Sequence, residues 1–415
     1  MSIALTMPLE ESLLKGKTVA VIGFNARPLA CSAKRAGAEV IVSDYWGDED
    51  LAECSSRWKA VLAPQRGQRQ RRPLEEPPHE ILVRNLLESI QGRQVNFLFV
   101  GSGFDDNTSS LRLLESEVPI AGNSSGLMST SRNFETLSSY ADELNLGFPT
   151  RLTAKSVAEA LDLCEEIGYP CVIRPPRSGG GRGITLVSNP VQAESASWKL
   201  EFDETVEEIV VQEYIQGIDA SCSVLSTGDD AKAVSVQGQL IGIPSAGRNN
   251  DFVYSGNYIP LEVNGVAKTR MELASESICE SFKLVGSNGI DFVVDKNGYV
   301  WLMEVNPRFQ GTLEMLEHSG NVSMTELHTS ACLGSLPSQW PSYVPAVRLV
   351  VFARRTGLIP DLSKYPSAVD RTPEGVLMKR GDPVCSLVLK RESLQSCYLE
   401  AMSAATSIQN GITPI

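Results

Sequence analysis

Histidine is scarce in this chain, and other features that would identify a class of protein are missing. Only three histidines occur among 415 residues, which argues against a histidine-based zinc site, and His318 and His328 are expected to be packed or surface residues. The nine cysteines are scattered and never form a Cys-x-x-Cys pair, which favours reduced, mostly buried thiols. No run of 18 apolar residues occurs, and proline and glutamate interrupt residues 1–17 before the apolar core of a signal peptide develops. We therefore expect a cytoplasmic protein.

An excess of positive charge is also missing, because the formal net charge is −13. Nucleic acids and anionic membranes are bound by basic surfaces, so neither is expected as a partner. Hydrophobic residues make up 42% of the chain, which is enough for buried cores. A chain of 415 residues exceeds the size of one compact domain, so two to four units are expected.

The chain begins with a strand, a helix and a second strand. Residues 18–23 are an apolar run, Pro28 suits the first turn of a helix, and Gly37 suits its end. A second apolar run follows at residues 39–42. This order predicts a Rossmann-like front domain in a mixed α/β protein.

Binding of a dinucleotide by this front domain is not supported. Gly23 is a single glycine where the fingerprint needs three, although Asp44 stands about where a ribose-binding acid would lie. Asn25, Arg27 and Asp44 are interpreted either as substrate contacts or as ordinary turn residues at strand ends.

The rest of the front region contains two loops of different character. Residues 64–80 combine prolines and arginines without periodicity and are interpreted as a solvated surface loop. A helix at 80–91 and a strand at 95–100 follow. The polar residues 101–107 then stand at the carboxyl end of that strand, where open α/β sheets bind ligands.

A hairpin is predicted within residues 289–308. If Asn297 and Gly298 form a two-residue turn, Asp291 lies opposite Glu304, and Asn306 shares their face. The other face would be core, with Ile290, Phe292, Val294, Trp301, Met303 and Val305.

Two opposed carboxylates repel each other unless a cation lies between them. Magnesium takes one or two carboxylates from a protein and completes its shell with water and phosphate oxygens, so the acids and Asn306 suit it. The alternative is that Asp291 and Glu304 are solvated residues on the outer face of an amphipathic hairpin.

A second informative stretch joins an apolar strand ending at Arg174 to residues 177–183, where four glycines alternate with arginines. Glycines let backbone N–H groups approach phosphate oxygens, and arginine supplies bidentate charge. By itself this pattern also fits a flexible hairpin tip.

The sequence Glu304-Val-Asn306-Pro-Arg308, with Asp291 upstream, resembles the metal-binding strand of the ATP-grasp enzymes. The resemblance implies that Asp291, Glu304 and Asn306 hold two Mg²⁺ ions, or Mn²⁺ in their place, on the phosphates of ATP. It also implies that Arg308 reaches the transferred phosphate or acyl group.

The same resemblance assigns the nucleotide site. Arg174 stands where the family usually has a phosphate-binding lysine, and the phosphate-covering loop would contain Ser178, Gly179, Gly180 and Gly181. Asp219 would bind the ribose, and the adenine would be lined by Gln212, Glu213, Tyr214 and Ile215, with Leu302 also in the nucleotide site. A plain edge strand remains the alternative for residues 210–215.

The resemblance covers most of the chain and implies four parts. These are a Rossmann-like domain (1–122), a linker helix with the small lobe of the ATP-grasp domain (123–215), a large lobe with the metal site (216–340) and a C-terminal β-rich cap (341–415). The implied activity is an ATP-dependent ligase that activates a carboxylate as an acyl phosphate and joins it to an amine. The alternatives are a bicarbonate-dependent carboxylase or carbamoyl-phosphate-type enzyme, and a non-catalytic ATP-binding module. Many members of the family are dimers, so the resemblance also suggests a homodimer.

Overall fold

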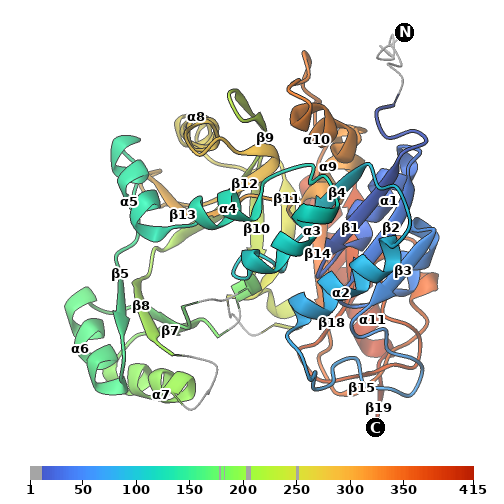
Figure 1. Ribbon diagram of the computed structural model, residues 1–415. Coiled ribbons are helices and arrows are strands. Elements are labelled where there is room, and N and C mark those ends of the chain that lie inside the picture. The colour runs from blue at the N-terminus through green and yellow to red at the C-terminus, as the bar shows by residue number, and fades with distance from the viewer. Residues whose placement is uncertain (1–11, 177–178, 182, 202–206, 249–251) are drawn as a thin grey trace.

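The computed structural model describes residues 12–176, 179–181, 183–201, 207–248 and 252–415. Its strands form a front sheet, a small antiparallel sheet and a large sheet, with a short three-stranded sheet near the C-terminus. The small sheet stands apart at the lower left of Figure 1, while the front sheet and the C-terminal elements pack together at the right. None of the described helices is long and apolar enough to cross a membrane.

The front sheet is parallel and confirms the Rossmann-like prediction. Its order is β3-β2-β1-β4, so the chain adds strands on both sides of β1. The loops after β1 and β4 therefore meet, and the N–H of Phe24 donates to the carbonyl of Ser102 at 2.8 Å. Such a switch point is where open α/β sheets bind ligands. The elements are β1 (Thr18–Gly23), α1 (Arg27–Arg35), β2 (Glu39–Asp44), η1 (Glu49–Cys54), β3 (Arg57–Ala60), α2 (Pro78–Ile90), β4 (Phe97–Val100), η2 (Thr108–Leu111) and α3 (Arg112–Glu117).

Two helices lead from the front sheet to the small sheet, whose strands are antiparallel in the order β5-β8-β6-β7. Alanine, valine and cysteine side chains of its two helices bury one face of this sheet. The elements are α4 (Ser125–Thr130), α5 (Phe134–Glu143), β5 (Arg151–Ala154), α6 (Val157–Ile167), β6 (Cys171–Arg174), η3 (Gly179–Gly181), β7 (Thr185–Val187), α7 (Pro190–Glu201) and β8 (Ile209–Glu213).

The large sheet has eight strands in the order β13-β12-β9-β10-β11-β14-β18-β16. Strands of the predicted cap extend this sheet, because β14 pairs with β11 and β18 with β14. Its first part contains β9 (Gly217–Thr227), β10 (Ala231–Ile241), η4 (Pro244–Ala246), β11 (Tyr254–Ile259), α8 (Gly265–Ser281), β12 (Val285–Asp295), β13 (Val300–Asn306), α9 (Leu313–Gly320) and α10 (Met324–Cys332). The C-terminal part contains β14 (Ala346–Phe352), β15 (Gly357–Leu358), η5 (Leu362–Lys364), β16 (Ala368–Val369), β17 (Leu377–Met378), β18 (Pro383–Lys390), α11 (Leu394–Gly411) and β19 (Thr413–Pro414).

The expectation of a solvated surface loop at residues 64–80 holds for most of its length, since residues 65–69 and 75–77 are exposed, but the loop is docked at one point. The side chain of Gln70 is 4% exposed and donates to Thr372 and to the carbonyl of Pro383. Backbone hydrogen bonds also join Gln68 and Gln70 to Leu377. The C-terminal segment that receives the loop lies some 300 residues away in sequence, so local composition could not indicate the contact.

The expectation of reduced thiols is wrong for one pair. Cys31 on α1 and Cys54 at the end of η1 form a disulfide across 23 positions of sequence. The other seven cysteines are free. A pair with this spacing has no motif, and only the packing of η1 against α1 brings the two sulfur atoms together.

Candidate active site

The hairpin of β12 and β13 places Asp291 opposite Glu304, as predicted. The predicted turn is wrong, however. Asp295 pairs with Tyr299 through an N–H···O bond of 3.0 Å, and the N–H of Gly298 donates to Asp295 at 2.9 Å. The turn is therefore one residue longer than a two-residue loop, and Gly298 adopts the left-handed conformation (φ +79°) that closes such turns.

A β-bulge between this turn and the two acids shifts the strand pairing by one residue in the opposite direction. The predicted pairing of Asp291 with Glu304 is therefore restored. Phe292 pairs with Leu302 while Asp291 pairs with Glu304, so Met303 is the additional residue. Consequently Val300 and Leu302 are core residues, whereas Trp301 and Met303, which were predicted to be core, are only half-buried. Leu302 is fully buried among apolar side chains, and its assignment to the nucleotide site stays a prediction.

The three predicted metal ligands lie together. The amide of Asn306 donates to Asp291 Oδ2 at 2.9 Å, and Gln239 donates to Asp291 Oδ1 at 2.9 Å. Burial, and next the charge of Glu304, raises the pKa of Asp291 to about 7. Two half-buried carboxylates opposite each other repel, and a cation bound between them would remove this repulsion.

This donor set fits Mg²⁺. Two carboxylates and an amide oxygen are the oxygen ligands that the ion takes from proteins before phosphate and water complete its shell. Among the described residues no group of three or more His, Cys, Asp and Glu side chains has metal-ligating geometry.

Arg308 and a second arginine, Arg132, bind these ligands. Arg308 donates to Asn306 Oδ1 at 3.0 Å and to Asp105 Oδ1 at 2.7 Å. Arg132 follows α4, pairs with Glu304, and donates to the carbonyl of Val305 at 2.9 Å. Sequence reasoning missed Arg132, which belongs to no motif. From the sequence, residues 101–107, which include Asp105, were identified only as a polar stretch after a strand.

Asp105 joins the front sheet to this site. It lies in the loop after β4, at the switch point of the front sheet, and its side chain is 15% exposed. Despite burial, the charges of Arg308 and Arg132 hold its pKa below the usual value. The strand-end loop therefore reaches the predicted metal strand, as its position in an α/β sheet suggested.

Two further arginines face the site from the small sheet. Arg174 ends β6 and donates weakly to Gln212 on β8 at 3.4 Å, so two predicted nucleotide residues lie together. Burial lowers the pKa of Arg174, and the charge of Arg151 on β5 lowers it further. Burial also lowers the pKa of Arg151. Both arginines are half-buried, and a phosphate bound between two such guanidiniums would reduce the repulsion between their charges.

The glycine loop meets the large sheet. Gly179, Gly180 and Gly181 form η3, and Gly180 and Gly181 have positive φ angles of 63° and 79°. A Cβ on Gly181 would lie 1.9 Å from the carbonyl oxygen of Phe252. Ser178, which was also predicted to bind phosphate, lies outside the described residues.

Gln212 and Glu213 end β8, and Tyr214 and Ile215 connect it to β9. The alternative of an edge strand is wrong, because β8 lies between β5 and β6. Tyr214 contacts Phe252 edge to face, with centroids 6.2 Å apart. These predicted adenine contacts therefore lie close to the segment that covers Gly181.

Asp219, the predicted ribose ligand, shares a face of the large sheet with Asp291. Their strands pair so that Asp291 lies opposite Ser221, and Asp219 is two positions before Ser221 on β9. Burial raises the pKa of Asp219 to about 6.

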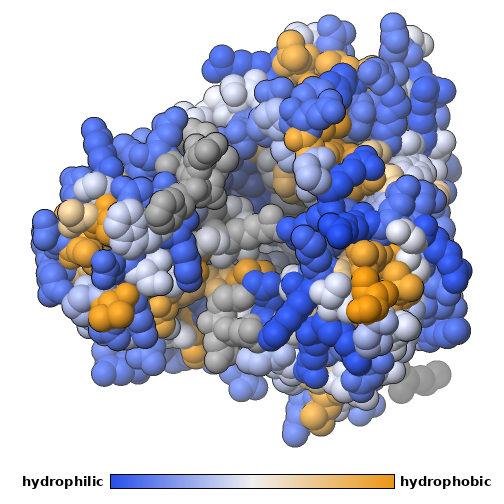
Figure 2. Space-filling model, turned by 90° about the horizontal axis from the view of Figure 1, so that it is seen from below, coloured by the Kyte–Doolittle hydropathy of each residue, from blue (hydrophilic) through white to orange (hydrophobic). Residues whose placement is uncertain are grey.

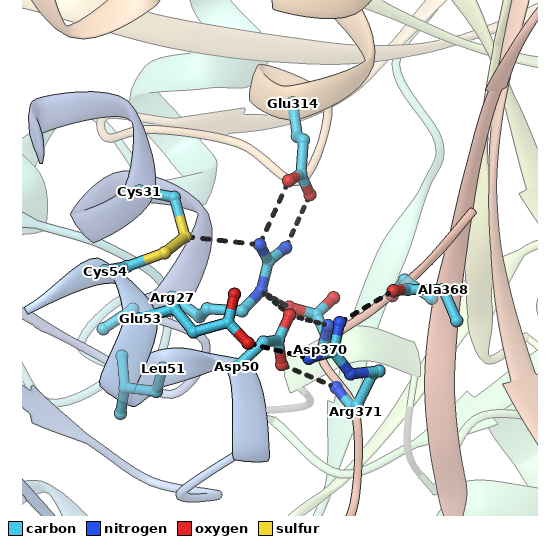
Figure 3. A network of polar contacts seen from close by, with 12 residues as sticks. Arg27, Cys31, Asp50, Leu51, Glu53, Cys54, Glu314, Ala368, Asp370 and Arg371 are labelled. Atoms are coloured by element: carbon cyan, nitrogen blue, oxygen red, sulfur yellow. Dashed lines mark hydrogen bonds and ion pairs between the residues drawn. A yellow bond between two sulfur atoms is a disulfide. The ribbon is translucent and has the colours of Figure 1, made fainter. Parts of the chain in front are cut away.

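Two of the three proposed contacts in the front domain have structural roles instead. Asp44 accepts the N–H groups of Ala26, Trp46 and Gly47. Arg27 is 2% exposed and is enclosed by the carboxylates of Asp50, Glu314 and Asp370 (Figure 3). Asn25 has a buried side-chain oxygen that has no hydrogen-bond partner among the residues that the structure describes, and nothing in this part of the fold assigns it a role.

Seen from below, the molecule is hollowed between the small sheet on the left and the front and C-terminal elements on the right (Figure 2).

Known proteins share both sequence and structure with this chain. Residues 136–312 match the family model of the ATP-grasp domain. An N5-carboxyaminoimidazole ribonucleotide synthetase (purK) solved with ADP has 15% identity and a TM-score of 0.70, with 97% of this chain and 100% of that chain covered. The carboxyaminoimidazole ribonucleotide synthase of Aspergillus clavatus, solved with ATP, has 16% identity and a TM-score of 0.70, with 95% and 99% covered.

A third similar structure is the biotin carboxylase domain of the 2-oxoglutarate carboxylase of Hydrogenobacter thermophilus. It was solved as a dimer with MgADP, ADP and bicarbonate. Its identity to this chain is 16% and its TM-score 0.69, with 94% of this chain and 89% of that chain covered.

Proposed function

Residues 136–312 of this chain are an ATP-grasp domain, and from this premise we propose that the protein is an ATP-dependent ligase. It would activate a small-molecule carboxylate as an acyl phosphate and join it to an amine, releasing ADP and phosphate. A homodimer is part of this proposal, since the domain from Hydrogenobacter thermophilus was solved as a dimer.

The observation that carries the proposal is the Asp291–Glu304 pair with Asn306 beside it, facing four arginines. These three side chains would hold Mg²⁺, which neutralises phosphate charge when bound. Transfer of a phosphoryl group needs charge stabilisation and alignment more than covalent chemistry, so a set of oxygen ligands facing guanidiniums has the required parts.

The arginines would bind different groups of the substrates. Arg308 extends from the metal strand and is oriented by Asp105 and Asn306, so it would bind the transferred phosphate or the acyl group. Arg174 and Arg151 would bind the nucleotide phosphates from the small sheet, and the N–H groups of Gly179–Gly181 would cover them. Contact of that loop with Phe252 would exclude water from the reacting atoms.

A bicarbonate-dependent carboxylase is the second candidate. Two of the similar structures are named as carboxyaminoimidazole ribonucleotide synthases, and a third contains bicarbonate. Gln310 also stands two residues after Arg308, so that an amide and a guanidinium occur together near the metal strand. In this case bicarbonate would replace the organic acid as the activated carboxylate.

The test is a measurement of ADP formation from Mg-ATP with pools of amino acids, dicarboxylates or bicarbonate. The ligase proposal expects turnover that needs both an acid and an amine, whereas turnover with bicarbonate favours the second candidate. Glu304→Ala should lower turnover by more than about 100-fold, because the metal loses a carboxylate ligand.

Asp229→Ala is the matched control, since Asp229 forms an exposed ion pair with Lys283, and it should keep wild-type turnover. Absence of turnover with every pool would contradict both candidates and would favour an ATP-binding module without catalysis.

A further inference from the structure

Arg132 lies on the ligands of the predicted metal site. Its guanidinium pairs with Glu304 and lies 3.4 Å from Asn306 Oδ1. It is also 3.8 Å from Asp105 and 3.7 Å from Asp106, and its side chain is 17% exposed. One guanidinium therefore contacts two of the three predicted metal ligands and two acids of the front domain.

The charges around this position nearly balance without any ion. The carboxylates are Asp105, Asp106, Asp291 and Glu304, with Glu135 near Arg151, and the guanidiniums are Arg132, Arg151, Arg174 and Arg308. A divalent cation arriving alone would add two positive charges beside four guanidiniums in a partly buried site, where charges interact strongly. The same cation arriving with a polyphosphate would leave the balance nearly unchanged.

The position of Arg132 also opposes binding of the metal alone. The carboxylate of Glu304, a predicted metal ligand, is already bound by Arg132, and the carbonyl of Val305 accepts a hydrogen bond from the same arginine. A nucleotide phosphate would give the Arg132 guanidinium another anion to bind in place of Glu304, and the Glu304 carboxylate could then turn to the metal.

We propose that Arg132 competes with the divalent cation for Glu304, so that this site binds the metal together with a nucleotide and not alone. The inference rests on the proposed function, because it takes Asp291, Glu304 and Asn306 as metal ligands. It goes beyond that function by giving Arg132 control over the order in which metal and nucleotide bind.

The experiment measures binding of Mn²⁺ to the full chain by electron paramagnetic resonance of free Mn²⁺ and by calorimetry, with and without ADP. For wild type we expect Mn²⁺ alone to bind at least about tenfold more weakly than Mn²⁺ with ADP. Arg132→Gln should bind Mn²⁺ alone at least about tenfold more tightly than wild type, since Glu304 loses its competing cation.

Control variants show whether the tighter binding of Mn²⁺ is specific to the loss of the charge of Arg132. Arg391→Gln makes the same substitution at an exposed ion pair with Glu400, remote in sequence from the site, and should leave Mn²⁺ binding unchanged. Arg132→Lys, which keeps the charge, should resemble wild type more than Arg132→Gln, and thermal unfolding of each variant shows that it is folded. Adding Glu304→Gln to Arg132→Gln should abolish the tight binding of Mn²⁺ alone.

The possible failures differ from each other. If wild type binds Mn²⁺ equally well with and without ADP, or if Arg132→Gln leaves the affinity for Mn²⁺ alone unchanged, the role of Arg132 is overturned while the metal site stands. If wild type binds no Mn²⁺ even with ADP, the metal site itself is wrong and both proposals fall.

Discussion

At the scale of single residues, His328 connects three elements from inside the molecule. Its ring nitrogens accept the N–H of Ser287 at 2.8 Å and donate to the carbonyl of Ala121 at 2.9 Å. The ring also packs on Phe309, with centroids 4.1 Å apart, directly after Arg308. Both nitrogens are satisfied only in the neutral form, and this agrees with the prediction of a packed histidine.

Protonation of His328 should destabilise the protein in acid. Burial lowers its pKa to about 4, whereas an unfolded histidine titrates near 6.5. The stabilising contribution is therefore present above about pH 6.5 and is lost as the pH falls towards 4, by about 3 kcal/mol in total.

Urea unfolding of wild type and His328→Gln between pH 7.5 and 4.5 measures this contribution. The variant should be less stable at pH 7.5 and should lose less stability on acidification. His79→Gln, at a half-exposed histidine, is the control. Parallel pH profiles for wild type and His328→Gln would contradict the assignment.

At the scale of elements, the conformation of the glycine loop depends on one position more than on the others. Gly181 has a positive φ angle and approaches the backbone of Phe252, whereas a Cβ on Gly179 would meet nothing within 4 Å. Because backbone atoms cannot rotate away as a side chain can, a methyl group at Gly181 must displace the loop.

We therefore expect Gly181→Ala to raise the Kd for ATP by about tenfold, while Gly179→Ala changes it by less than about twofold. Calorimetric titration with ATP and Mg²⁺ checks this, and thermal unfolding should show little difference between the variants. If the two variants bind ATP with equal affinity, the loop does not contact the nucleotide.

The metal hairpin shows what a pattern of residues can and cannot predict within an element. The alternation of Asp291 with apolar neighbours identified the polar face correctly. The bulge at Met303 and the longer turn at Gly298 could not be read from it, because both depend on how the strand packs on its neighbours. Their shifts are opposite, so the pairing of Asp291 with Glu304 was predicted correctly although the turn was not.

At the scale of the whole molecule, a buried network joins the front sheet to the large sheet and the C-terminal segment. Arg27 binds Glu314 on α9 at 2.5 Å and Asp370 at 2.6 Å, and Asp370 also accepts from Arg348 on β14 at 2.8 Å. Asp50 on η1 accepts the N–H groups of Asp370 and Arg371 (Figure 3).

Arg27→Met should destabilise the protein by about 3–5 kcal/mol, because it leaves the surrounding carboxylates buried without their cation. Urea unfolding measures the change. Arg391→Met, at an exposed ion pair, should cost less than about 1 kcal/mol. A similarly small loss for Arg27→Met would show that this network does not hold the domains together.

The sequence by itself determined the alternation of strands and helices, the polar face of the metal hairpin and the position of the glycine loop. These are local, because periodicity and turn residues act over a few positions. Only the tertiary structure decided that Arg132 and Asp105 reach Glu304 and Arg308, that Arg27 is a structural rather than a substrate residue, and that Gln70 binds the C-terminal segment. Those contacts join positions about 170 to more than 300 residues apart, and ion pairs across such separations leave no periodic trace in the sequence.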